Sequence, residues 1–158
     1  MPKKKLTEKI LVIIPVRGNS KRLKNKNILP IKGMPMFLYV AQKILKSKNK
    51  LRIIVSSENS KILKICKDNN IEFLKRPKYL SGDEIEKQDV IVHATRHISK
   101  KEKFFPNIII SLQTNTPQVN SNDLDKAIKF FKSIFVGKKI KEVFAVGKDN
   151  LQNGAFRI

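Results

Sequence analysis

The sequence predicts an α/β fold of the Rossmann-like, doubly wound kind with a mostly parallel sheet. Two observations lead to this prediction. Short runs of apolar, β-branched residues alternate along the chain with longer segments whose apolar residues recur at helical spacing. The runs are continuously apolar, which is typical of strands buried on both faces of a parallel sheet. In such sheets ligands bind at the carboxyl ends of the strands.

Three strands and two helices are expected before residue 75. Residues 10–15 (ILVIIP) form the first apolar run and predict a buried strand. Residues 36–46 carry apolar side chains at helical spacing, and residues 52–56 (RIIVS) predict the second strand, which completes a strand–helix–strand unit. A second helix ends near residues 69–70, and residues 71–74 predict the third strand.

The alternation continues through the second half of the chain. Residues 86–98 predict a helix with an apolar inner face, and residues 107–112 (NIIISL) predict the next strand. A further helix carries Leu124, Ile128 and Phe131, and residues 142–146 predict a last strand, a candidate for the sheet edge. The expected helix-capping residues are Ser57 or Ser60 for the second helix and Ser121 or Asn122 for the fourth.

Composition points to a single cytoplasmic domain over residues 1–158. The 158 residues are 41% apolar, which is ordinary for a globular domain, and no apolar run is long enough to span a membrane. The lysine-rich N-terminus lacks the pattern of a secretory signal. The one cysteine, Cys66, cannot form an internal disulfide and is expected in the core.

The net charge of +21, from 34 basic and 13 acidic residues, raises a nucleic-acid hypothesis. Only 6 of the 34 are Arg, the residue that reads bases and phosphates by paired hydrogen bonds. Aromatic residues are sparse and are not interleaved with the basic ones as a stacking surface requires. Nucleic acid is therefore a poor candidate partner, whereas small anionic ligands fit the charge.

The loop that follows the first strand is the best candidate binding site. Residues 16–27 (VRGNSKRLKNKN) hold five cationic side chains, one Gly, one Ser and three Asn. Gly18 permits a close backbone approach, and backbone N–H groups in such a turn bind anions. The loop matches neither a Walker A motif nor the dinucleotide fingerprint. A phosphate group is the expected ligand, and a solvated basic loop without a ligand is the alternative.

Five segments, in order, resemble the motifs of the N-acylneuraminate cytidylyltransferases, also called CMP-sialic acid synthetases. The first is the loop itself with its flanks, residues 13–27 and 32–35. Residues 54–58 (IVSSE) resemble the second-strand motif, although Glu58 stands where Asp is usual. The remaining three are residues 75–83 (KRPKYLSGD), 112–117 (LQTNTP) and 153–155 (NGA). Each motif is weak alone, but five in order are specific.

The resemblance implies an enzyme that joins CTP to a 2-keto-3-deoxy sugar acid, sialic acid or a related nonulosonic acid, and releases pyrophosphate, with Mg²⁺ as cofactor. Arg17 and Lys26 would be catalytic through charge stabilisation at the phosphates. The residues implied to bind the nucleotide are Arg17, Gly18, Ser20, Lys21, Lys26, Asn27, Arg76 and Asp83, with the loop from Asp83 to Lys87 near the base and ribose. Gln113 and Asn153 would face the sugar.

Three departures from the family pattern shape what we expect of this chain. The Asp-x-Asp segment that supplies Mg²⁺ ligands in the family would lie beyond residue 158, so the metal ligands are unknown here. The interval between Gln113 and Asn153 is too short for the family's dimerisation insertion, which puts a homodimer in question. Gln118-Val119 replaces a common Leu-Arg and Arg157 replaces a common aromatic residue, which leaves the acceptor open.

Four alternatives remain at this stage. The chain could use another acceptor such as the eight-carbon Kdo, could bind CTP without turnover, or could bind nucleic acid. Separately, Asp89, His93 and His97 recur every four residues on a predicted helix and could share a metal ion, although no Glu accompanies them as in His-Glu-x-x-His. A role at the edge of the apolar face is the simpler interpretation of these histidines.

Overall fold

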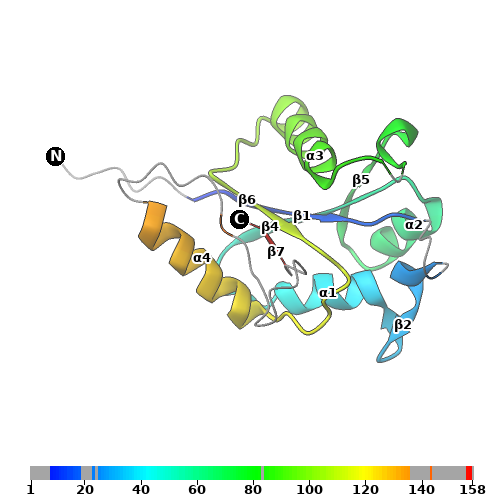
Figure 1. Ribbon diagram of the computed structural model, residues 1–158, viewed down its shortest axis with the longest axis horizontal. Helices are drawn as coiled ribbons and strands as arrows, with labels where there is room; N and C mark the ends of the chain where they lie inside the picture. The colour runs from blue at the N-terminus through cyan, green and yellow to red at the C-terminus, as the bar shows by residue number, and fades with distance from the viewer. Residues whose placement is uncertain are drawn as a thin grey trace.

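A five-stranded sheet forms the centre of the molecule (Figure 1). The computed structural model describes residues 8–18, 23, 25–82, 84–135, 143 and 156–157. The strand order is β5-β4-β1-β6-β7, in which the first four strands are parallel and β7 is antiparallel to β6. The strands are β1 (Ile10–Pro15), β4 (Leu51–Ser57), β5 (Glu72–Lys75), β6 (Ile108–Leu112) and β7 (Phe156–Arg157). This arrangement confirms the predicted Rossmann-like, mostly parallel sheet.

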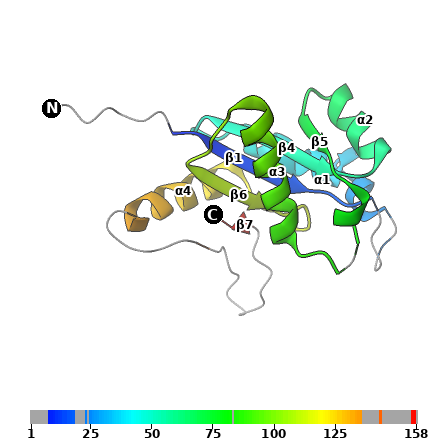
Figure 2. The ribbon, with the colours of Figure 1, turned by 90° about the horizontal axis from the view of Figure 1, so that it is seen from above.

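Helices cover both faces of the sheet. They are α1 (Met36–Ile44), α2 (Ser60–Asp68), α3 (Lys87–Glu102) and α4 (Ser121–Phe135). Helix α3 lies on one side of the sheet, and α1 and α4 lie on the other (Figures 1 and 2). The short elements are the 3-10 helices η1 (Lys26–Ile28) and η2 (Lys78–Leu80) and the hairpin of β2 (Pro30–Ile31) and β3 (Met34–Pro35).

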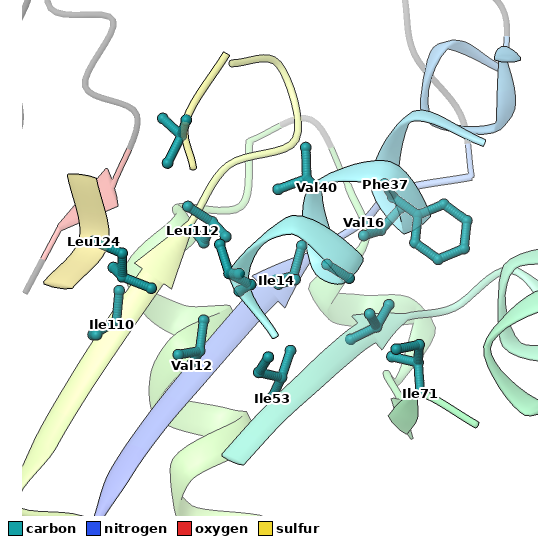
Figure 3. Packing of buried hydrophobic residues seen from close by; sticks show 14 of the residues in the cluster. Val12, Ile14, Val16, Phe37, Val40, Ile53, Ile71, Ile110, Leu112 and Leu124 are labelled. Atoms are coloured by element: carbon teal, nitrogen blue, oxygen red, sulfur yellow. The ribbon is translucent and has the colours of Figure 1, made fainter. Parts of the chain in front are cut away.

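The side chains of β1 divide the core into two layers. Ile10, Val12 and Ile14 belong to the larger cluster, which packs against α1, α2 and α4 (Figure 3). Leu11 and Ile13 belong to the smaller cluster, which packs against α3. All five are at most 2% exposed. Because successive side chains of a strand point to opposite faces, burial of the whole run requires cover on both sides, as the continuous apolar pattern predicted.

The expected strands and helices up to residue 135 are present, with boundaries shifted by a few residues. Cys66 is fully buried in the larger cluster, as expected. The expected caps are wrong. The side chain of Asn59 accepts from the N–H groups of Lys61 and Ile62, and that of Asn120 accepts from Asn122 and Asp123. In both helices the Asn directly precedes the first helical residue, Ser60 or Ser121, so the Asn and not the Ser occupies the capping position.

The expected strand over residues 142–146 lies outside the described residues, apart from Val143. The hairpin β2–β3 was not predicted because each of its strands has two residues. Its turn uses Lys32 and Gly33 at positive φ, 50° and 81°. Within the described part of the chain, no helix combines the length and apolarity needed to cross a membrane.

Candidate active site

A cleft of about 350 Å³ lies at the carboxyl ends of the parallel strands. Its lining comes from the ends of β1 and β6, from η1, from the segment between β5 and α3, and from the first turn of α3. The lining residues are Pro15, Arg17, Lys26, Asn27, Arg76, Leu80, Gly82, Ile85, Lys87, Val90, Gln113, Thr114 and Asn115. The parallel register places these strand ends at one edge, which is where α/β folds bind ligands.

The loop after β1 is anchored to the end of β4. Val16 donates its backbone N–H to Ser56 at 2.9 Å, and Gly18 donates its N–H to the Glu58 carboxylate at 2.7 Å. A Cβ added to Gly18 would lie 2.2 Å from Asn59 Nδ2, so glycine is required at this position by close packing. The close approach predicted at Gly18 is thus an approach to Asn59 and Glu58.

Asn27 connects the loop to the neighbouring strand. Its Nδ2 donates to the backbone carbonyl of Arg17 at 2.9 Å, and its Oδ1 accepts from the Thr114 hydroxyl at 2.7 Å. Thr114 is 6% exposed and follows β6. The amide of Asn27 therefore determines how the two sides of the cleft face each other.

Arg76 is the most deeply buried charged residue of the described chain, at 3% exposure. Its Nη2 donates to Glu58 Oε2 at 2.6 Å and to the Val16 carbonyl at 3.4 Å, whereas its buried Nε has no partner within the described residues. Burial by itself raises the pKa of the Glu58 carboxyl, but the hydrogen bonds from Arg76 and Gly18 outweigh it and hold this pKa below its usual value.

Cationic side chains converge on the cleft from three segments. Arg17 donates to the Gly82 carbonyl at 3.5 Å, Lys26 begins η1, and Lys87 begins α3. Burial, together with repulsion from Arg17, lowers the pKa of Lys87. The described residues of the lining include no carboxylate. A site with this lining stabilises a bound anion, and the amino-terminal end of α3 adds a favourable dipole.

Of the predicted site residues, the cleft brings together Arg17, Lys26, Asn27, Arg76 and Gln113. Gly18 supports the loop from outside the lining. Ser20, Lys21, Asp83 and Asn153 lie outside the described residues.

Sequence reasoning did not single out Thr114, Asn115 or the role of Glu58. The first two lie inside the family-like motif at residues 112–117, and the only sign at Glu58 was that it stands where the family usually has Asp. The pattern of residue types did not reveal that Glu58 reaches Gly18 and Arg76, because both contacts join segments distant in the chain.

The described residues do not supply a Mg²⁺ site. No group of three metal-ligating side chains occurs among them, and the described lining offers only neutral oxygens, from Asn27, Gln113, Thr114 and Asn115. Mg²⁺ favours carboxylates and phosphate oxygens, so we assign it no ligand among the residues that the structure describes.

Asp89, His93 and His97 line a second hollow, of about 400 Å³, on α3. The histidine rings lie 6.2 Å apart. Together with the absence of a three-ligand group in the described chain, this leaves the metal alternative without support.

The fold and the cleft define a Rossmann-like α/β domain with a cleft at the strand ends that is lined by cationic side chains. The profile of the cytidylyltransferase family matches residues 11–137, so the chain belongs to this family. It is 29% identical to an N-acylneuraminate cytidylyltransferase of Escherichia coli O18:K1:H7 (strain RS218 / NMEC) over 142 residues. This aligned segment is 90% of this chain and 32% of the relative. The family resemblance seen in the motifs is thereby confirmed.

Two further similarities concern proteins of related description. A 3-deoxy-manno-octulosonate cytidylyltransferase of Wigglesworthia glossinidia brevipalpis is 32% identical over 123 residues, which is 77% of this chain and 47% of the relative. The solved structure of a CMP:2-keto-3-deoxy-manno-octonic acid synthetase in complex with CTP superposes with a TM-score of 0.70 at 19% identity, over 87% of this chain and 52% of that one. The chain spans between about a third and a half of the length of these relatives.

Proposed function

We propose that the cleft binds CTP and that the protein transfers CMP to a 2-keto-3-deoxy sugar acid, sialic acid or a related nonulosonic acid, with release of pyrophosphate. The observation that carries this proposal is the convergence of Arg17, Lys26 and Lys87 on one cleft at the carboxyl edge of the sheet. Membership in the cytidylyltransferase family supports the choice of nucleotide. A solved structure of similar fold was determined in complex with CTP, which also supports the choice of nucleotide.

The transfer of CMP requires mainly that the reactants be positioned and that the negative charge of the phosphates be stabilised. The anomeric hydroxyl of the sugar attacks the α-phosphorus of CTP and gives its proton to solvent water. A new P–O bond forms, and the bond from the α-phosphorus to the bridging oxygen breaks as pyrophosphate leaves. Arg17 and Lys26 have the catalytic role in this proposal, because fixed cations stabilise the charge that develops on the departing phosphates. Mg²⁺, which the family resemblance implies, would share this charge when bound.

The acceptor is assigned to Gln113, which lines the cleft after β6, together with Asn153. Gln113 lies directly after β6, and its amide is suited to the hydroxyl and carboxylate groups of a sugar acid. Kdo, with eight carbons, is the other acceptor class, and the similarity to a 3-deoxy-manno-octulosonate cytidylyltransferase favours including it in every assay.

The test is an assay of pyrophosphate release by the full chain with CTP, Mg²⁺ and a panel of eight- and nine-carbon sugar acids. We expect release with CTP, none with ATP or GTP, and a clear preference for one acceptor. Absence of both turnover and CTP binding would overturn the proposal. CTP binding without turnover would identify a binding protein. Salt-sensitive binding to DNA or RNA with no preference for CTP would support the nucleic-acid alternative.

Variants of two cleft residues test whether CTP binds in the cleft. Arg17→Ala and Lys26→Ala should each weaken CTP binding by about 10- to 100-fold, because a charge-assisted hydrogen bond contributes about 1.5–3 kcal/mol. Lys64→Ala, on the exposed face of α2, removes the same charge far along the chain from the cleft lining and is the matched control. Unchanged affinity in both cleft variants would place the nucleotide elsewhere.

A further inference from the structure

Glu58 stands outside the cleft lining but contacts two segments that form it. Its Oε1 accepts from the backbone N–H of Gly18 at 2.7 Å, and its Oε2 accepts from Arg76 Nη2 at 2.6 Å. The Glu58 side chain is 19% exposed and that of Arg76 is 1% exposed. One carboxylate therefore joins the start of the loop after β1 to the segment after β5.

The contact with Gly18 constrains Arg17. The carbonyl of Arg17 is held by Asn27, and the residue that precedes it, Val16, is held by Ser56. With Gly18 bonded to Glu58, the backbone on both sides of Arg17 is held. The Gly18 amide donates to Glu58, so this N–H is already engaged within the protein.

The contact with Arg76 neutralises a buried charge. A guanidinium at 3% exposure is costly unless a counter-charge lies within hydrogen-bond distance, and Glu58 provides one. Arg76 also lines the cleft, and its backbone N–H donates to the Ser57 carbonyl at 2.8 Å. Removal of the Glu58 charge would leave Arg76 unpaired within the wall of the proposed nucleotide site.

We propose that Glu58 is a positioning residue: without touching the nucleotide, it holds Gly18 and Arg76 in the arrangement that binds CTP. This inference rests on the proposed function. Glu58 differs from Asp, the residue usual in the resembling motif, by one methylene. That extra length lets its two oxygens reach two segments at once, so Glu58→Asp should lose one of the two contacts.

The experiment measures CTP affinity by calorimetry and Gly18 amide exchange by NMR in Glu58→Gln, Arg76→Met and the double variant. Glu58→Gln keeps the shape and one acceptor oxygen, which preserves the fold. We expect it to weaken CTP binding at least 10-fold and to accelerate Gly18 exchange at least 10-fold. Glu58→Asp should weaken CTP binding less than Glu58→Gln does, and should accelerate Gly18 exchange less.

Double substitution tests whether Glu58 and Arg76 act as one unit. In that case the double variant should bind CTP about as weakly as Arg76→Met alone, because the effects of coupled residues are not additive. Independent effects, whose fold-changes multiply, would overturn the inference. So would wild-type affinity and wild-type Gly18 exchange in Glu58→Gln.

Glu72→Gln is the matched control, because Glu72 forms an ion pair with Arg52 between the same two strands at their opposite ends. It should change neither CTP affinity nor Gly18 exchange. If the wild-type chain binds no CTP, the proposed function fails, and Gly18 exchange alone decides the role of Glu58: acceleration in Glu58→Gln supports it, and no change overturns it.

Discussion

Thr114 donates a hydrogen bond of 2.7 Å to the side-chain oxygen of Asn27, across 87 positions of the chain. The same Asn27 amide donates to the carbonyl of Arg17 at 2.9 Å. These two bonds connect the loop after β1 to the end of β6, and both segments contribute residues to the cleft lining.

Thr114→Val should remove this connection while conserving the side-chain shape. Because Asn27 Oδ1 is left without its donor in a partly buried place, we expect a loss of about 1–3 kcal/mol in the free energy of unfolding and weaker CTP binding. Urea denaturation and calorimetry measure the two effects. Thr116→Val, which removes a longer bond of 3.4 Å to Gln113 in the same loop, should cost less. Equal losses would contradict this account.

The sheet was predictable because burial on both faces leaves a local mark, a run of apolar residues such as residues 10–15. The helices were predictable from a different local mark: each buries one face, so its apolar residues recur at helical spacing. The helix caps were not, since Ser57 and Ser60 have the same capping chemistry as Asn59 and only the backbone path decides among them.

The site was predictable only in part. The cationic loop and the motif at residues 112–117 are local patterns, and the structure brings Arg17, Lys26 and Gln113 to one cleft. The bonds of Glu58 to Gly18 and Arg76 and of Thr114 to Asn27 join segments that are 18 to 87 positions apart. Their geometry depends on strand order and register, and no residue pattern along the chain specifies either.

Lys87 should take up protons when an anion binds in the cleft. Its pKa is lowered by burial and by Arg17, so a bound polyphosphate, which supplies negative charge, should raise it again. CTP binding at alkaline pH, below the ordinary lysine pKa of about 10.4, should therefore take up protons. Phosphate, with a second pKa of about 6, no longer titrates there. Calorimetry in buffers of different ionisation enthalpy measures the uptake, and Lys87→Met should abolish it. Uptake that persists in this variant would assign it to another group.

His93 should limit stability in acid. Burial, then the charges of His97 and Arg76, lower its pKa, and its buried Nδ1 has no partner within the described residues. The unfolded chain, with a histidine pKa of about 6.5, then binds the proton more readily than the folded one. The contribution of neutral His93 to the free energy of unfolding should be fully present above this pH. It should be lost as the pH falls below it, toward the lower pKa of the folded state.

Two variants check this assignment. His93→Leu should flatten the dependence of the denaturation midpoint on pH between about 5 and 7, relative to wild type. His97→Gln removes a charge that lowers the pKa of His93, so the His93 ring signals in NMR should titrate at higher pH. If the denaturation midpoint of His93→Leu depended on pH as the wild-type midpoint does, other groups would cause the loss of stability in acid.

Gly18→Ala tests whether glycine is needed for packing or for backbone conformation. Gly18 is not in the left-handed region, whereas Gly33 is, so the backbone at residue 18 accepts alanine. The new Cβ would lie 2.2 Å from Asn59 Nδ2 and 2.7 Å from Asn59 Cβ. An overpacked contact of this kind costs about 1–3 kcal/mol, and it should also weaken CTP binding by displacing Arg17.

A second substitution at the partner should reverse the effect. Asn59→Gly removes the three atoms nearest to a Cβ added at residue 18, and as a cap of α2 the glycine costs only a few tenths of a kcal/mol. The double variant should therefore be more stable than Gly18→Ala alone. Gly82→Ala, whose Cβ would meet Ile85 at an ordinary 3.7 Å, should leave the unfolding free energy within about 0.5 kcal/mol of wild type. If Asn59→Gly gives no rescue, the requirement for glycine at residue 18 comes from the loop that follows it and not from the α2 cap.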